Sequence, residues 1–237
     1  MSRTRLRGFS RSDTTRAEAF SDGVLAIAVT LLALGLADPP HRQGGLGRAL
    51  LAQWPSYLGY LASFGYVSVI WLNHHQAFVR VRVMDRGLHA ANLLLLFTTA
   101  ALSFPTAVLA DALQAEPAGS DARVAVALYA GLAAAMCLSW VAFYHQLARR
   151  PELLNPDVER AYVRHGRVRS WAGALAYGAA GLLGVLVTPL SAVAVFLVLP
   201  VFYFLTTEGL PAGRPPERHP RSGARQGGAP PTARDRT

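Results

Sequence analysis

Long apolar stretches without charge are the feature that most limits how this chain can fold. They cover residues 23–37, 54–80 (charged only at the final arginine), 88–110, 124–147 and 170–207. The hydrocarbon core of a bilayer is about 30 Å thick and needs roughly 20 apolar residues per helix. Most of the runs reach or approach that length. The sequence therefore predicts an all-α, polytopic membrane protein.

The last run is too long for one membrane helix. Its 38 residues would extend about 57 Å as a single helix, nearly twice the hydrocarbon thickness. Thr188-Pro189 lies near the middle, and proline does not continue a helix from the preceding turn. We therefore divide the run into 170–187 and 189–207, joined as a tight hairpin. The prediction becomes six transmembrane helices per subunit.

Composition supports the same class of protein. Hydrophobic residues make up 52% of the chain and charged residues 16%, compared with about 25% charged in an average soluble domain. These values exclude a disordered chain, a nucleic-acid-binding basic domain and a disulfide-stapled secreted module. The single cysteine, Cys137, has no partner for an internal disulfide. We expect a lipid bilayer as surroundings, no nucleic acid as partner and no cofactor.

The distribution of arginine predicts the orientation, because basic residues accumulate on the cytoplasmic side of membrane proteins. Arginine is dense before the first span, between the second and third, between the fourth and fifth, and in the tail. The alternate connections carry few basic residues. Six spans in a cell membrane with both termini cytoplasmic satisfy this pattern. The chain then divides into a cytoplasmic basic arm (1–15), a six-helix membrane domain (16–207) and a disordered Arg/Pro/Gly-rich tail (208–237).

The start of the chain permits a second interpretation. Basic residues precede the apolar run, and Gly35-Leu36-Ala37 before Asp38 is similar to the cleavage site of a signal peptide. Asp22 at the head of the run, and Leu34 and Leu36 near the site, fit that interpretation only in part. We retain it as the less favoured alternative.

Polar residues are expected to gather where the first three spans meet the cytoplasm. Asp13, Thr14 and Thr15 are good helix caps, so Asp22 lies about two turns inside the first helix, where an ionisable group needs a partner. The second span ends, and the third begins, at the same depth. The residues that share this depth are Arg16, Ser21, Asp22, Asn73, His74, His75, His89 and Asn92. We predict a polar network among these helices, and we favour a structural pin that fixes the rotation of the first helix.

The residue types of this network also suit three other roles. The ligand types suit zinc, but adjacent His74 and His75 point about 100° apart on a helix. An intramembrane hydrolase would use Ser21 as nucleophile with Asp22 and a histidine, although no known nucleophile arrangement is present. A proton-coupled transporter would use Asp22 and the histidines as a relay.

The remainder of the first helix is apolar on one face. Ile27, Leu31 and Leu34 follow helical spacing. Thr30 and the small residues Ala26, Ala28 and Ala33 occupy other faces, which suits close helix packing. Lipid is the default neighbour of an apolar face. If copies of this helix met around an axis, however, the three large residues would form stacked hydrophobic rings that constrict a pore by excluding water.

Two segments resemble a known family. Arg16-x-x-x-Phe20-Ser21-Asp22, followed by Gly-Val-x-Ala-Ile-Ala-x-Thr-Leu-Leu, is similar to the signature of the endosomal/lysosomal potassium channel family of the transmembrane protein 175 type. Trp71-Leu-Asn73-His74-His75-x-x-Phe78 resembles the second-helix segment of that family. The likeness covers the first three spans. The family it points to includes prokaryotic members with one six-helix repeat per chain.

The resemblance implies a passive, potassium-favouring cation channel that assembles as a homotetramer, with the first helices lining the pore. It places the constriction at Ile27, continues the rings at Leu31 and Leu34, and gives Thr30 a role in supporting the filter. It assigns a structural network to the motif residues Arg16, Phe20, Ser21, Asp22, Asn73, His74 and His75. It also implies that the channel has neither a carbonyl selectivity filter nor a voltage sensor, and that it is not an enzyme. Selectivity among potassium, sodium and protons is not specified by the sequence.

Overall fold

The computed structural model describes residues 14–205, which fold into eight α-helices and one short 3₁₀ turn. The predicted basic arm and the Arg/Pro/Gly-rich tail fall mainly on residues 1–13 and 206–237, outside the described residues. The all-α prediction is confirmed for the described part. The helices are α1 (Thr14–Ala33), α2 (Leu46–Ala52), α3 (Trp54–Arg80), α4 (Arg86–Ala100), α5 (Ser103–Ala115), α6 (Ser120–Arg149), α7 (Arg160–Leu186) and α8 (Pro189–Leu205), with the 3₁₀ turn at Pro151–Leu153.

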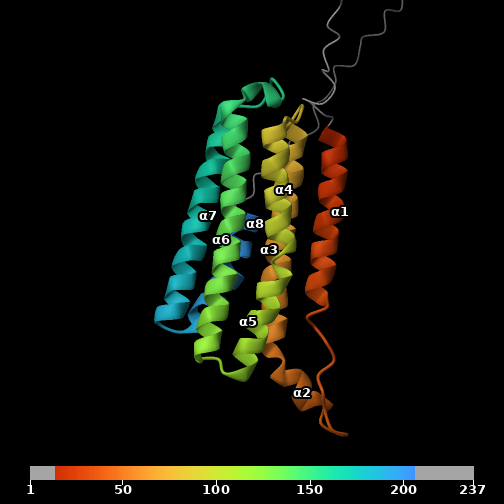
Figure 1. The fold of residues 1–237 in the computed structure, drawn as a ribbon, viewed down its shortest axis with the longest axis vertical. Helices are drawn as coiled ribbons and strands as arrows, with labels where there is room; N and C mark the ends of the chain where they lie inside the picture. The colour runs from red at the N-terminus through yellow and green to blue at the C-terminus, as the bar shows by residue number, and fades with distance from the viewer. Residues whose placement is uncertain (1–13, 206–237) are drawn as a thin grey trace, which may run out of the picture.

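The long helices run roughly parallel to one axis and form a bundle (Figure 1). Helices α6 and α7 lie on one side, α3 and α4 occupy the middle, and α1 stands at the opposite edge. The start of α1, the α3–α4 connection and the α6–α7 connection gather at one end of the bundle. The short α2 lies at the other end, crosswise to the long helices. Helix α1 thus has neighbours on one side only within the single chain.

The arginine-rich end of the bundle is fastened by main-chain hydrogen bonds. Val81 and Leu154 form an isolated antiparallel β-bridge. The amide of Arg82 donates to the carbonyl oxygen of Leu153 at 2.8 Å, and the amide of Asn155 donates to that of Arg80 at 3.0 Å. These bonds tie the two connections that follow α3 and α6. Both connections therefore keep a fixed position beside the start of α7.

Two helix boundaries depend on proline. Helix α7 ends at Leu186 and α8 begins at Pro189, so the predicted hairpin at Thr188-Pro189 is confirmed. The predicted single span over 88–110 is interrupted at residues 101–102, between α4 and α5. Pro105 explains the interruption, because it has no amide to bond the carbonyl of Ala101 and its ring clashes with that carbonyl.

Helix α7 also begins earlier than its apolar run. It starts at Arg160, whereas the sequence placed residues 160–169 in a basic connection before a span beginning at residue 170. The arginines of this stretch therefore stand on the first turns of a continuous helix. Hydropathy locates the apolar part of a helix and not its polar extension.

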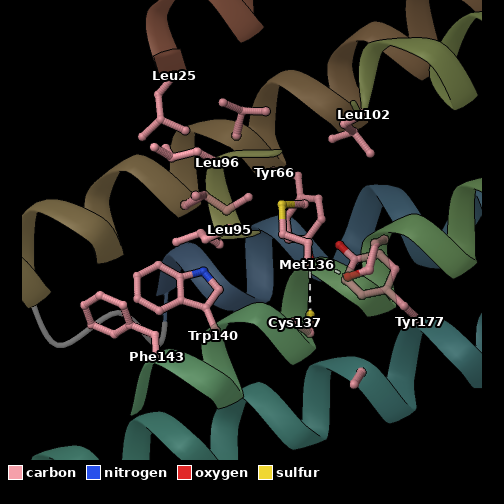
Figure 2. Packing of buried hydrophobic residues seen from close by; sticks show 14 of the residues in the cluster. Leu25, Tyr66, Leu95, Leu96, Leu102, Met136, Cys137, Trp140, Phe143 and Tyr177 are labelled. Atoms are coloured by element: carbon pink, nitrogen blue, oxygen red, sulfur yellow. Dashed lines mark hydrogen bonds between the residues drawn. The ribbon is translucent and has the colours of Figure 1, made fainter. Parts of the chain in front are cut away.

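Apolar side chains from seven helices, all but the short α2, form one core. Figure 2 shows Leu25 of α1 pointing towards Leu96 of α4, while Trp140 and Phe143 of α6 lie beneath Leu95. Leu25 and Leu32 of α1 are 2% and 4% exposed. The segment considered above as a signal peptide is thus a packed helix of this fold, and the alternative is not supported.

Two helical stretches are long and apolar enough to cross a membrane on length and composition: Arg86–Ala115, which comprises α4 and α5, and Ser120–Arg149, which is α6. Helix α8 is apolar but shorter. The described part of the chain is therefore all-helical, and two of its helical stretches have the length and apolar composition of membrane spans.

Candidate functional site

Helix α1 has one packed face and one open face. Ser21, Leu25, Ala28 and Leu32 are buried, at helical spacing. On the opposite side the exposed fractions are 56% for Phe20, 60% for Ile27 and 42% for Leu31. Together with Leu34, 75% exposed, these residues are called the outer stripe of α1. The stripe is apolar, and its side chains are exposed within residues 14–205.

The structure modifies the predicted stripe at its end. Leu34 follows the last helical residue, Ala33, and its amide donates to the carbonyl oxygen of Leu31 at 3.2 Å. The Thr30 side chain is exposed, and its hydroxyl donates to the carbonyl oxygen of Ile27 at 2.8 Å. Among the small residues, Ala28 is buried, whereas Ala26 and Ala33 are exposed in the single chain.

A directed chain of hydrogen bonds crosses from α3 through α4 to α1. Asn92 of α4 lies between Ser21 and His74, at 3.0 Å from the hydroxyl oxygen of Ser21 and 3.0 Å from Nε2 of His74. Ser21 in turn donates to the carbonyl oxygen of Ala17 at 2.8 Å. All three side chains are buried, with exposed fractions of 0% to 2%. We call this set the relay.

The Ala17 carbonyl fixes the direction of every bond in the relay. A carbonyl only accepts, so the Ser21 hydroxyl proton points to Ala17 and its oxygen is left to accept. Asn92 must then present its amide nitrogen to Ser21 and its oxygen to His74. His74 therefore carries its proton on Nε2 and donates. Its Nδ1 has no hydrogen-bond partner among the described residues, as expected for the unprotonated ring nitrogen.

Aromatic rings enclose His74 on its remaining sides. The imidazole stacks on Phe78 with 4.2 Å between ring centroids and meets the edge of Trp140 at 6.5 Å. This packing keeps water from the ring, so the relay is rigid and dry. Such a group fixes the rotation of α1 because a twist of the helix would break the bond at Ser21.

Asp22 is bound by a residue that the depth argument did not include. Its Oδ1 accepts a hydrogen bond from the indole nitrogen of Trp71 at 3.1 Å. The sequence had suggested Arg16 or the histidines as its partners. Arg16 is exposed, and no hydrogen bond or ion pair within residues 14–205 joins it to Asp22.

Two further predicted members, His75 and Asn73, bind elsewhere. Nδ1 of His75 lies 3.1 Å from Oε1 of Glu18. Asn73 accepts from the guanidinium of Arg169 on α7 and donates to the carbonyl oxygen of Val69 at 2.8 Å. By their hydrogen bonds, the polar residues at this level thus form four separate groups instead of one network.

Sequence reasoning missed Glu18, Arg169 and the donor role of Trp71. One signal was available for Glu18, which stands four residues before Asp22 and so shares its helix face. Arg169 lies almost 100 positions after Asn73 in the chain, and no local pattern predicts that pairing.

The geometry does not favour the zinc and hydrolase interpretations. His74 and His75 bind different partners on different helices. Within the described residues, no cluster of three or more His, Cys, Asp or Glu side chains is placed to hold one metal ion. Ser21 points its proton at a carbonyl oxygen and not at a base, so it is not activated as a nucleophile.

An open groove runs between α1 and α3 beside Asp22. Its volume is about 490 Å³. Apart from Asp22, Trp71 and Ser68, its lining is apolar and comes from Leu25, Ala26, Val29, Phe64, Val67 and Leu72. Both this groove and the outer stripe therefore leave apolar surface of α1 uncovered in the single chain.

Comparison with known proteins is consistent across sequence and structure. Residues 16–102 match the family described as endosomal/lysosomal potassium channel TMEM175. A protein named as a potassium channel from Streptomyces collinus is 43% identical over 167 residues, which span 70% of this chain and 80% of the relative. Human TMEM175, named as an endosomal/lysosomal proton channel, is 41% identical over 88 residues, or 33% of this chain and 18% of that protein.

A solved structure extends the likeness to the whole bundle. The crystal structure of a lysosomal potassium-selective channel TMEM175 homologue from Chamaesiphon minutus superposes with a TM-score of 0.71 at 37% identity, covering 81% of this chain and 96% of that one. The matched family consists of ion channels and not of enzymes. The chain therefore belongs to the TMEM175 family of membrane ion channels.

Proposed function

We propose that this chain forms a passive, potassium-favouring cation channel in which four copies place their α1 helices around a central pore. The observation that carries the proposal is the contrast between the two faces of α1. One face is pinned to α3 and α4 by the relay, while the outer stripe is apolar and open. A helix held in rotation and left bare on one side is suited to line a pore.

The proposed subunit spans the membrane six times. The spans are α1, α3, the interrupted pair α4 and α5, α6, α7 and α8. Both termini are cytoplasmic in this proposal, and the location is the plasma membrane. Its support is that the arginine-rich connections after α3 and α6 lie at the same end as the start of α1 (Figure 1), which is the arrangement that the positive-inside rule requires.

The proposed constriction is a ring of Ile27 side chains, followed by rings of Leu31 and Leu34. Apolar rings regulate conduction by controlling whether water fills the pore. Thr30 supports this region, because its hydroxyl is bonded to the carbonyl oxygen of Ile27. Backbone carbonyls of α1 remain in helical bonds, so no carbonyl selectivity filter is part of the proposal. The proposal includes no voltage sensor either.

The tetramer provides cover for surfaces that the single chain leaves open. The groove between α1 and α3 is mostly apolar and has a volume of about 490 Å³. In the proposed assembly a neighbouring copy packs on it. Arg16 and Phe20, both exposed on α1, complete the structural network between copies, together with Ser21, Asp22, Asn73, His74 and His75 within each copy.

Proton conduction through the same pore is a second candidate, favoured by the name of the human relative. A proton-coupled transporter based on Asp22 and the histidines has less support. Asp22 is bonded to Trp71, and the described hydrogen bonds do not connect it to a histidine. A transporter would show saturable flux driven by a pH gradient, whereas a channel would not saturate in that way.

The decisive experiment measures potassium and proton flux from liposomes that contain the purified protein, with and without an Ile27→Asn substitution. We expect potassium flux in the wild type and altered potassium-to-sodium selectivity in the variant. Leu175→Asn is the matched control, because Leu175 is 70% exposed on α7 at the other side of the bundle. Absence of flux from well-folded protein, or equal effects of both substitutions, would contradict the proposal.

A further inference from the structure

Two side-chain interactions, called ties here, join the first turns of α1 to α3 and are separate from the relay. Oε1 of Glu18 lies 3.1 Å from Nδ1 of His75, and the two side chains are 28% and 50% exposed. One turn further along α1, Asp22 accepts from Trp71. The Trp71 ring also stacks on His75, with 6.2 Å between centroids and 19° between planes. The two ties therefore share the Trp71–His75 surface of α3.

Protonation affects these ties unequally. The indole of Trp71 does not titrate, so its bond to Asp22 persists at any physiological pH. An imidazole changes charge between about pH 5 and 8, and only the protonated ring forms an ion pair with the Glu18 carboxylate. The pair is solvent-accessible, which allows His75 to exchange protons with the surrounding water.

The charged and titratable surroundings of His75 can be enumerated for each packed helix. Helix α1 provides the carboxylates Glu18 and Asp22, which both favour a positive imidazole. Helix α3 provides His74, which carries its proton on Nε2 and whose buried Nδ1 has no hydrogen-bond partner among the described residues. Helix α4 carries His89, three residues before Asn92. The two acidic groups thus dominate the local charge.

The direction in which the tie pulls follows from the faces of α1. Glu18 and Asp22 face α3, whereas Phe20 and Ile27 lie on the outer stripe. Strengthening the Glu18–His75 pair therefore draws the start of α1 towards its own subunit. Weakening it frees this end of the helix to lean in the direction that the outer stripe faces.

We propose that Glu18 and His75 are positioning residues for α1: the protonated pair holds the start of the helix away from the pore axis, and loss of the His75 proton loosens it and narrows the pore at that end. This inference rests on the proposed function for the location of the axis. It adds control of conduction by pH on the side of the membrane where α1 begins.

Potassium flux from liposomes, with the pH on that side varied from 6 to 8, tests the proposal. Wild-type flux should fall about two- to fivefold over this interval, which is the population change expected of an exposed ion pair. His75→Arg keeps a positive partner for Glu18 and should hold flux near the acidic level throughout. His75→Gln and Glu18→Gln should hold it near the alkaline level. His145→Gln, at an exposed position of α6, should retain the wild-type profile.

A wild-type pH profile in His75→Gln and Glu18→Gln would overturn the proposal. Absence of flux in the wild type and in every variant would contradict the proposed channel function instead. The Glu18–His75 pair is then tested by its contribution to protein stability. A double-mutant cycle of Glu18→Gln and His75→Gln, followed by thermal unfolding in detergent, should show coupling at pH 6 that is smaller at pH 8. Additive effects at both pH values would show that the pair does not hold α1.

Discussion

Asn92 donates a hydrogen bond to Ser21 across the contact between α4 and α1, with 3.0 Å between Nδ2 and Oγ, while its own oxygen accepts from His74. One side-chain amide of α4 thus forms hydrogen bonds with both α1 and α3. Few side chains can replace it, because the position requires a donor and an acceptor on opposite sides of a planar group.

Asn92→Ala should reduce stability by about 1 to 2 kcal/mol, since it leaves a buried imidazole donor and a buried hydroxyl acceptor without partners. Ser21→Ala should cost less, because only the Asn92 amide loses its acceptor. Ser68→Ala is the matched control: that hydroxyl bonds only the carbonyl of its own helix at Phe64. Thermal unfolding in detergent gives the ranking, and equal effects of Ser21→Ala and Ser68→Ala would argue against the relay.

Trp71→Phe should lower the stability of the subunit by about 1 kcal/mol or less. Asp22 loses a hydrogen-bond donor, while an aromatic ring remains to stack on His75. Arg16→Gln should change stability less in the detergent-solubilised subunit, since Arg16 is exposed and not bonded to Asp22. Trp171→Phe on α7, at a residue that is 49% exposed, controls for loss of an indole. Unfolding curves for the three variants decide whether Asp22 depends on the indole or on the arginine.

Two glycines of α7 should respond to alanine with opposite signs. An added Cβ at Gly181 would lie 2.5 Å from Cβ of Ala130 on α6, whereas at Gly178 nothing lies within 4 Å. Gly181→Ala should therefore destabilise by about 1 to 3 kcal/mol through overpacking. Gly178→Ala should stabilise by about 0.5 to 1 kcal/mol, because alanine is the better helix former. Thermal unfolding of both variants checks the sign, and a loss at Gly178 would indicate contact with another copy.

Smaller side chains at the proposed constriction should raise potassium conduction without altering the stability of the subunit. Ile27→Ala and Leu31→Ala each remove an exposed side chain, so neither leaves a cavity in the subunit core. We expect a larger increase in liposome potassium flux for Ile27→Ala, since the narrowest ring is placed there. Leu25→Ala would instead empty part of the core, at a cost of about 2 to 5 kcal/mol, and is unsuited as a pore variant. An increase confined to Leu31→Ala would move the constriction along α1.

The long elements were accessible from sequence because their physical causes are local. A run of apolar residues defines α3 and α6, and a proline defines the start of α8. The break before α5 also has a local cause, Pro105, but hydropathy alone does not reveal it because the apolar run continues across the break. The polar start of α7 was missed for the complementary reason: its arginines form helix without contributing to an apolar run.

The site divides in a similar way. Helical spacing correctly placed Ile27 and Leu31 on one face, and membrane depth brought Ser21, His74 and Asn92 to one level. Partner choice within that level was not predictable. Trp71 lies about one turn before the histidines on α3, and rotation of α3 about its own axis determines which of them meets Asp22. That rotation is set by core contacts between helices distant in sequence, such as Tyr66 of α3 and Cys137 of α6, 3.2 Å apart in oxygen–sulfur distance.

The Ala17 carbonyl at the end of the relay has an electrical consequence. A hydrogen-bonded wire moves a proton only if each member can both receive one and pass one on, and a peptide carbonyl has none to pass. The row of His74, Asn92 and Ser21 is consequently a dead end for proton hopping, although it lies close to the helix proposed to line the pore. These polar groups therefore lie beside the proposed ion pathway without creating a leak that would dissipate a pH gradient.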